Sequence, residues 1–498
     1  MINKIFGPPG TGKTTHLLSI VEKLLQEGVD ANKIAFTTFT KAGATEALER
    51  ACAKFNKSID DFPFFKTLHA LAYKHGSKKQ VLGYVDYKQL SENLNLPLTY
   101  GQNNSDGAVT SSYRGDHIMA IYQLARVKLI SVEQSYEEYD GTFNIDFGEV
   151  ERFVEHYKEY KDYTNKQDFT DMLEGYVIKD KPLDIEYLIV DEAQDIKPLE
   201  WNMVDVVKRN CVNTWIAGDD DQCIHAWAGS DPDAFMNIDG STEILSKSYR
   251  VPESIHTAAH MVIKRIAKRQ VKEYTPKEIE GSVQRIISIE DLTIDKGSWF
   301  FLARNKRMLQ DYEMYCRKMG YLYDVPGKKS IGSVFEAIVL WEQLINGGLV
   351  QGAEAKLVYK HLKERDRIKT GSRKLLKDLV DDDQLIDIHD LKSNYGLLCH
   401  GSWEDAFIQI TTEEKDYITK IEKTVGFDEA PRIEINTIHG SKGKEADNVV
   451  LMTDMSVKTH DSFLNNPDNE HRVFYVGMTR AKENLYIVAP HTERYYEI

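Results

Sequence analysis

The chain has 498 residues, which is too long for one compact core and predicts two to four domains. Hydrophobic residues make up 42% of it and charged residues 28%, the balance of a soluble globular protein, and no apolar run is long enough to cross a bilayer. The formal net charge of −15 argues against binding duplex nucleic acid through a broad basic face, so any nucleic-acid site must be a local basic or aromatic channel.

The cysteines and the N-terminus point to an intracellular protein. Five cysteines are scattered without a C-x-x-C pair, so neither a zinc site nor a disulfide framework is expected. Met1 to Lys4 lead directly into a folded motif, so no signal peptide is expected. We therefore expect a cytoplasmic protein.

The first half of the chain predicts a parallel sheet with a helical insertion. Strands and helices alternate in the first 84 residues, as they do in parallel α/β sheets. The expected strands in this half are Ile2–Phe6, Lys33–Phe39, Tyr187–Asp191 and Thr214–Gly218, and the expected helices are Thr14–Glu27 and Ala42–Lys54. Between Val85 and about Asp168 the sequence is polar, rich in tyrosine and mostly helical, with a Gly/Asn/Ser loop at 100–112.

The second half predicts a second sheet with its own insertion. Its expected strands are Val283–Ile289, Trp299–Leu302, Ile433–Thr437, Val449–Thr453 and Leu485–Val488. The predicted fold class is therefore α/β, with two parallel-sheet domains that each carry a mostly helical insertion. We place the first domain at 1–84 and 169–240 with its insertion at 85–168, and the second at 241–346 and 429–498 with its insertion at 347–428.

A phosphate-binding loop follows the first predicted strand. The run G-P-P-G-T-G-K-T at 7–14 fits G-x-x-x-x-G-K-[ST], with a strand before it and a helix after it. Lys13 should reach the β- and γ-phosphates, and Thr14 should hold Mg²⁺. The predicted nucleotide-binding residues of this loop are Gly7, Pro8, Gly10, Thr11, Gly12, Lys13, Thr14 and Thr15.

A pair of carboxylates supplies the partner that such a loop needs. The apolar run L-I-V at 188–190 delivers Asp191 and Glu192 at the end of a predicted strand, where ligands bind in open parallel sheets. Asp191 would bind Mg²⁺, and Glu192 would polarise the attacking water. These residues predict a Mg-dependent ATPase, a class that includes transporters, kinases and motors.

Further motifs resemble those of superfamily-1 helicases of the UvrD/Rep/PcrA type. D-E-A-Q-D at 191–195 is similar to the family's D-E-x-Q-D box, and Y-V-G-M-T-R-A at 475–481 to its Y-V-G-x-T-R-A segment. Other matches, in the family's order, are T-F-T at 38–40, T-L-H at 67–69, G-D-D-D-Q-C-I-H-A-W-A-G at 218–229, S-Y-R at 248–250 and T-I-H-G-S-K-G-K-E at 437–445. The resemblance implies two RecA-like domains with ATP and Mg²⁺ between them.

The resemblance also assigns roles around the nucleotide. It implies that Arg250 and Arg480 reach the γ-phosphate as arginine fingers, although ordinary surface ion pairs are the alternative. Gln222 would sense the same phosphate or stabilise its own loop. Tyr249 would stack on adenine or pack in the core, and Glu445, beside Gly443, would accept a hydrogen bond from the ribose or remain a solvated carboxylate.

A path for a single strand is implied across both sheets. The candidates by resemblance are Phe39, Thr67, His69, Trp227, Thr437 and His439. Aromatic rings stack on any base, and hydroxyl groups hold phosphates without reading sequence. Trp227 could instead plug the core, and His69 could be an ordinary hydrogen-bonded histidine.

The resulting hypothesis is an ATP-dependent DNA helicase that acts as a monomer on single-stranded DNA and at junctions with duplex. The segment at 437–445 resembles the UvrD-type form of this motif and not that of the RecD-like branch, which implies 3′ to 5′ movement. The alternatives are a translocase that displaces proteins with little unwinding, and a Mg-ATPase switch that is no motor.

The sequence departs from the family at His225, where relatives carry Tyr, and at Ala228, where an Arg often stands. The Lys/Arg-rich tract at 356–377 either holds duplex phosphates or is a solvated helix face.

Overall fold

The computed structural model describes residues 1–99, 113–139, 141, 143–329, 332–424, 426 and 430–498. These residues form two compact units. Unit 1 comprises Met1–Arg285, Thr437–Glu445 and Thr453–Ile498, and unit 2 comprises Ile286–Asn436 and Ala446–Met452. The loop expected at 100–112 lies outside the described residues.

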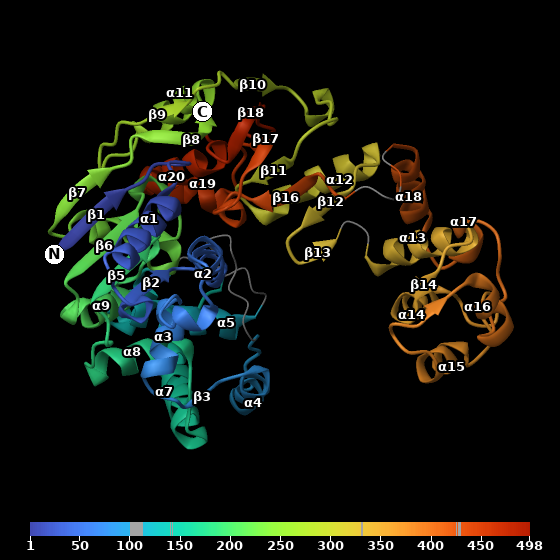
Figure 1. Ribbon diagram of the computed structural model, residues 1–498, viewed down its shortest axis with the longest axis horizontal. Helices are drawn as coiled ribbons and strands as arrows, with labels where there is room; N and C mark the ends of the chain where they lie inside the picture. Colours follow the sequence, from blue (N-terminus) through green and yellow to red (C-terminus); the bar gives the residue numbers. More distant parts are fainter. Residues whose placement is uncertain (100–112, 140, 142, 330–331, 425, 427–429) are drawn as a thin grey trace. The chain divides into compact units, whose positions relative to one another are not determined.

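A parallel sheet forms the centre of unit 1. Its strand order is β2-β5-β6-β1-β7, and Figure 1 shows β1, β5, β6 and β7 running side by side. The strands are β1 (Ile2–Phe6), β2 (Ile34–Thr38), β5 (Tyr187–Asp191), β6 (Asn213–Gly218) and β7 (Ser241–Ile244). The four strands predicted here are confirmed. β7 was not predicted, and it extends the sheet beyond the expected domain boundary at residue 240, so the division into four domain segments remains a prediction.

Helices cover both faces of this sheet because its strands are apolar on both sides. On one face, α1 (Lys13–Gln26) and α2 (Lys41–Phe55) pack on Ile5, Phe36 and Ile189. On the other face, α3 (Leu68–His75), α8 (Phe169–Lys179) and α9 (Pro198–Val207) pack on strand residues that include Phe6 and Val190. The pairing of Phe6 with Gly218 and of Thr38 with Asp191 aligns the carboxyl ends of neighbouring strands. Loops that carry the predicted motifs therefore meet at one edge.

The predicted helical insertion of unit 1 has a core of its own. It contains α4 (Tyr84–Leu94), α5 (Arg114–Lys128), α6 (Val132–Glu137) and α7 (Phe147–Thr164), with the short strands β3 (Gln80–Val81) and β4 (Lys166–Gln167) beside them. A charge network fastens α5 and α7 to α8. Arg126 Nη1 donates to Asp168 Oδ2 at 2.7 Å, and Lys161 Nζ reaches Asp171 at 2.7 Å.

The remainder of unit 1 packs helices against short strands. β8 (Lys247–Pro252) lies parallel to β9 (Thr275–Lys277), and β10 (Ser282–Ile286) neighbours β18 (Ala481–Val488). The helices here are α10 (Pro232–Met236), α11 (Glu253–Ile263), α19 (Val457–Asn465) and α20 (Pro467–Met478). Six residues of α20 and its C-terminal neighbours at 473–481 are apolar and buried, so this helix passes through the interior.

Unit 2 contains the other parallel strands and a helical lobe. β11 (Trp299–Ala303) runs parallel to β17 (Ala446–Met452), and β12 (Tyr323–Val325) runs parallel to β16 (Ile433–Thr437) with β13 (Lys328–Lys329) antiparallel at its edge. The helices are α12 (Leu309–Met319), α13 (Ser333–Ile345), α14 (Gly352–His361), α15 (Ser372–Leu379), α16 (Ile388–Asn394), α17 (Trp403–Ala406) and α18 (Thr412–Thr424), and β14 (Val350–Gln351) pairs with β15 (Leu385–Ile386). The α/β class with parallel sheets is confirmed. In the described part of the chain, no helix is both long and apolar enough to cross a membrane.

The buried network around Arg126 gives a stability prediction. Arg126→Met would leave Asp168 and two other carboxylates without their main cation, and we expect a loss of about 3–5 kcal/mol in the free energy of unfolding. Urea denaturation followed by circular dichroism measures it. The matched control is Arg114→Met, because Arg114 and Glu149 form a half-exposed pair at 2.5 Å whose loss should cost about 1 kcal/mol or less. Equal losses for the two variants would contradict the prediction.

Candidate nucleotide and nucleic-acid site

The loop between β1 and α1 has a shape that requires glycine. Gly10 and Gly12 have φ angles of 73° and 76°, in the left-handed region that other residues avoid. A Cβ atom at Gly7 would lie 2.0 Å from Cγ of Lys13. Lys13 Nζ donates to the Gly7 carbonyl at 3.0 Å, so the loop curls round the start of α1. Thr11 closes it by donating to the Pro8 carbonyl at 2.8 Å.

The two predicted metal ligands are in contact. Thr14 Oγ1 donates to Asp191 Oδ2 at 2.9 Å, although 177 residues separate them. Burial and the neighbouring Glu192 raise the pKa of Asp191. Burial acts to raise the pKa of Glu192 too, but Lys13 and Lys442 hold it below its usual value. The two carboxylates therefore differ, and Glu192 is the one that stays ionised most readily.

Gln194 joins the carboxylate box to the acidic loop that follows β6. Its Nε2 donates to Glu192 Oε2 at 2.6 Å, and its Oε1 accepts from the Asp219 amide at 2.9 Å. Gly218 lets the two segments approach, since a Cβ there would lie 2.7 Å from Gln194 Oε1. The sequence identified Gln194 only as a letter of the D-E-x-Q-D motif.

Arg480 reaches the predicted phosphate sensor. Its Nη2 donates to Gln222 Oε1 at 2.9 Å, and Gln222 Nε2 donates to Asp219 Oδ2 at 2.7 Å. Arg480 is only 1% exposed. Burial, together with the charge of Arg250, lowers the pKa of Arg480 to about 9, so the guanidinium is still charged at neutral pH.

Arg250 lies beside the phosphate-binding loop. Its strand, β8, is docked on that loop, because Ser248 Oγ donates to the Pro9 carbonyl at 2.7 Å and the Tyr249 amide donates to the Gly10 carbonyl at 2.8 Å. A Cβ atom at Gly10 would lie 2.4 Å from Cβ of Arg250, which is a second reason for glycine there.

The remaining residues predicted to bind the nucleotide are Glu445, Tyr249, Gly443 and Thr15. Arg250 Nε donates to the carboxylate of Glu445, so Glu445 already has a cationic partner. Tyr249 leaves 67% of its surface exposed, and Gly443 is left-handed with a φ of 83°. Thr15 Oγ1 accepts from Arg50 Nη2 at 2.7 Å.

Lys442 connects the segment at 437–445 to the loop after β5, which carries Asp195, and to the loop after β6, which carries Gln222. Its Nζ lies 2.5 Å and 2.7 Å from the Asp195 carboxylate oxygens and 2.8 Å from the Gln222 carbonyl. The sequence located the lysine in a motif but gave no sign of its partner.

The acidic loop after β6 is neutralised by residues that no motif contains. Asp219, Asp220 and Asp221 are all fully buried. Lys272 Nζ contacts all three carboxylates, at 2.9 Å for Asp219 and Asp221. Arg269 adds a two-pronged contact to Asp221 at 2.7 and 2.5 Å.

Three of the predicted nucleic-acid residues gather round His225. Its ring stacks on Phe39 with centroids 5.8 Å apart, and the rings of Trp227 and His439 each lie 6.1 Å away. Burial lowers the pKa of His225 to about 3, with Lys442 and Lys197 contributing, so the imidazole at the centre is uncharged at neutral pH. His225, which the sequence marked only as a departure from Tyr, is the centre of this aromatic cluster.

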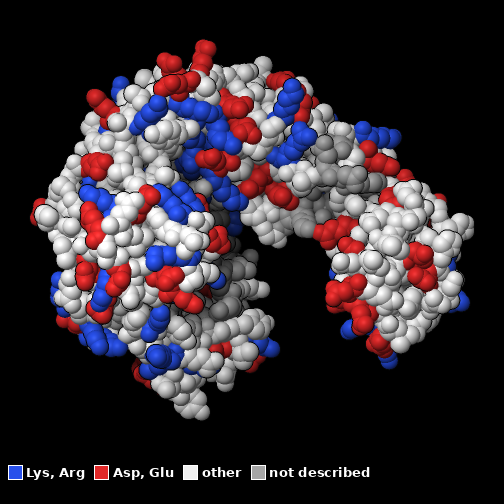
Figure 2. Space-filling model, in the orientation of Figure 1, with Lys and Arg blue, Asp and Glu red and all other residues white. Residues whose placement is uncertain are grey.

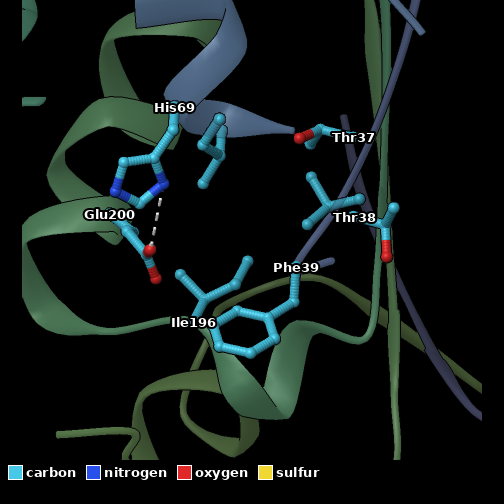
Figure 3. Close-up of a pocket in the computed structure, with 8 residues that line it drawn as sticks. Thr37, Thr38, Phe39, His69, Ile196 and Glu200 are labelled. Carbon is cyan, nitrogen blue, oxygen red and sulfur yellow. Dashed lines mark ion pairs between the residues drawn. The ribbon is translucent and has the colours of Figure 1, made fainter. Parts of the chain in front are cut away.

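A pocket separates Phe39 from His69. Figure 3 shows the Phe39 ring beside Ile196 and the His69 ring facing Glu200, with Thr37 and Thr38 on a further side of the pocket. His69 Nδ1 lies 3.8 Å from Glu200 Oε1. Thr67 caps α3 by accepting from the Ala70 amide at 3.3 Å, and the buried Thr437 accepts from the Gly440 amide at 3.1 Å. The predicted contacts of these residues with a strand remain predictions.

Local partners occupy part of the basic tract in unit 2. Lys356 and Lys363 form ion pairs with Asp382 and Asp366, at 2.8 Å and 2.6 Å. Arg373 donates to backbone carbonyls of Tyr359 and Leu362. Figure 2 shows acidic side chains gathered along one edge of the lobe formed by α13 to α17. The visible face of this lobe is therefore mixed in charge.

Two family models match the chain. The UvrD/REP helicase N-terminal domain matches residues 2–243, and the UvrD-like helicase C-terminal domain matches residues 402–492. Together they cover more than half of the sequence.

Relatives of known name share low identity with this chain. A probable DNA helicase of Mycoplasma pneumoniae is 23% identical over 54% of this chain and 54% of its own length. A probable DNA helicase II homolog of the same organism is 20% identical over 68% and 50%. The ATP-dependent DNA helicase PcrA of Leuconostoc citreum is 25% identical over 56% and 39%. The matches thus span about half the length of these relatives.

The buried lysine of the acidic loop gives a second stability prediction. Lys272→Met should lower the free energy of unfolding by about 3–5 kcal/mol, because three buried carboxylates would lose their shared cation. Thermal and urea denaturation both measure this. Lys268→Met is the control, since Lys268 and Asp233 form a partly exposed pair that should contribute about 1 kcal/mol or less. A Lys272→Met variant as stable as the control would show that the cluster is not needed.

Proposed function

This chain belongs to the UvrD/REP helicase family, and we propose that it is an ATP-driven motor that moves along single-stranded DNA and separates duplex ahead of it. We further propose that it works as a monomer, recognises junctions of single and double strand, and moves 3′ to 5′. The observation that carries the proposal is the bond between Arg480 and Gln222. This hydrogen bond links Arg480, a predicted arginine finger, to Gln222 at the edge of the first sheet, where the predicted phosphate-binding loop also lies.

The residues at this edge fit ATP and Mg²⁺. The left-handed glycines of the loop at 7–14, the start of α1 and Lys13 form a cradle for phosphate oxygens. Thr14 Oγ1 and Asp191, already 2.9 Å apart, would hold Mg²⁺, which neutralises phosphate charge when bound. Every group that the cradle needs comes from unit 1.

Hydrolysis needs a proton acceptor and positive charge. Glu192 would take the proton of the attacking water as the water oxygen bonds to the γ-phosphorus, and the bond from that phosphorus to the bridging oxygen would break to release ADP. The lowered pKa of Glu192 favours the ionised form that this task requires. Arg480 and Arg250 would neutralise charge on the transferred phosphoryl group. Because Gln222 contacts Asp219 and Arg480 at once, a phosphate that moves Gln222 would also move the arginine.

The strand would follow the aromatic cluster at Phe39, His225, Trp227 and His439. Stacking on a ring contributes about 1–3 kcal/mol per base and is independent of sequence. Parting one base-pair step costs about 1.4 kcal/mol on average, which is less than one ATP supplies. Lys442 and His439 belong to one short segment, so a movement at the nucleotide would reach the strand directly.

The first functional prediction concerns hydrolysis. ATP turnover should rise about tenfold or more on addition of oligothymidylate, and Lys13→Ala should abolish turnover with or without the strand, because Lys13 would neutralise charge on the transferred phosphate. A coupled assay of ADP release measures both. Lys264→Ala, at the exposed residue that follows α11, serves as the control. Turnover that ignores the strand would reject both motor hypotheses and favour an ATPase switch.

The second functional prediction concerns the direction of movement and the unwinding of duplex DNA. Duplexes with a 3′ tail should be separated in an ATP-dependent manner, and duplexes with a 5′ tail should not, if movement is 3′ to 5′. Release of a fluorescent strand from each substrate measures this. Release of streptavidin from a biotinylated single strand without separation of either duplex would instead identify a translocase that displaces proteins.

A further inference from the structure

Lys197 is the N-cap residue of α9 and belongs to none of the motifs. Its Nζ lies 5.7 Å from the centroid of the Phe39 ring, within the range of a cation–π contact. It is half-buried, and it follows the carboxylate box after only one residue, Ile196, which lines the pocket of Figure 3. A cation therefore stands directly over the first aromatic residue of the predicted strand path.

Lys197 differs from the neighbouring lysines because its charge has no acidic partner. Within the described residues, no carboxylate lies within 4.0 Å of its Nζ, whereas Lys442 is paired with Asp195 and Lys13 is 4.0 Å from Glu192. Glu200 is near in sequence, but one of its oxygens accepts from the Lys197 amide at 2.9 Å and the other faces His69 at 3.8 Å.

The charge of Lys197 also acts on the predicted strand residues around it. Burial lowers the pKa of His69 and of His225, and Lys197 lowers both further. Both imidazoles are thus neutral at pH 7. Lys197 is then the positive group shared by Phe39, His69 and His225, on a protein whose net charge is −15.

We propose that Lys197 binds a backbone phosphate of the strand, at the nucleotide whose base stacks on Phe39. A nucleotide carries base and phosphate on one sugar. An ammonium group 5.7 Å from the centroid of the Phe39 ring can turn from the ring to the phosphate when the base takes its place on the ring. The ring supplies stacking and the lysine supplies charge, and neither reads sequence. This inference rests on the proposed function and adds a site residue that the motifs do not contain.

The salt dependence of binding distinguishes a phosphate contact from a packing role. Each phosphate neutralised on a single strand contributes about 0.7 to the slope of log K against log salt concentration. We would measure the affinity of the full chain for fluorescent oligothymidylate by anisotropy over a salt series. Lys197→Gln should weaken binding at low salt and reduce the slope by about 0.7, and Lys197→Arg should restore the slope.

Two control variants separate the contributions. Phe39→Leu should weaken binding while leaving the slope unchanged, because it removes a ring and no charge. Lys264→Gln should change neither quantity. Partial unfolding of a variant would lower the concentration of protein able to bind. It would therefore weaken the apparent affinity by one factor at every salt concentration and leave the slope unchanged.

The outcomes are distinct. A Lys197→Gln variant with weaker binding but an unchanged slope would overturn the proposal and show that the lysine only supports the Phe39 ring. An unchanged affinity would overturn it as well. Failure of the unmodified chain to bind the oligonucleotide at any salt concentration would instead reject the proposed function.

Discussion

The burial of three adjacent aspartates after β6 is the constraint on which the site depends. Carboxylates at 219–221 cannot leave water without cations, since an unpaired buried charge costs several kcal/mol. The chain supplies Lys272 and Arg269 from a segment about fifty residues further on, and Arg472 Nε donates to the Asp220 carbonyl at 3.0 Å. The loop that carries Gln222 can therefore fold only when that later segment and α20 are docked beside the first sheet.

The same docking brings the nucleotide residues and the strand residues within reach of one short segment. Between 437 and 445, His439 lies in the aromatic cluster, Lys442 holds Asp195, and Glu445 holds Arg250. Contacts of this kind transmit movement because ion pairs in a packed interior have few alternative positions. Coupling between ATP hydrolysis and movement along the strand would then need no long chain of intervening residues.

Local sequence patterns predicted the strands of the sheet better than they predicted the ion pairs and cations around its loops. The strand Tyr187–Asp191 was predicted correctly, and a glycine-rich loop does join β1 to α1, because apolar runs and glycine spacing are local signals. The binding of phosphate by that loop stays a prediction. β7 and β8 escaped prediction, since their residues alternate weakly and their pairing is decided by distant partners. Lys272 and Lys197 look like ordinary surface lysines in the sequence, and only the fold shows that one is buried among carboxylates and the other stands over a ring.

The backbone of Glu192 carries a consequence for evolution and engineering. It has a φ of 54°, a conformation that costs a residue other than glycine or asparagine about 1 kcal/mol or more. Selection of random variants for stability alone would favour glycine at this position. Each such variant would lose the carboxylate that faces Lys13. Glutamate at this position thus costs the backbone free energy that glycine would not, and what the chain keeps in exchange is a carboxylate beside Lys13.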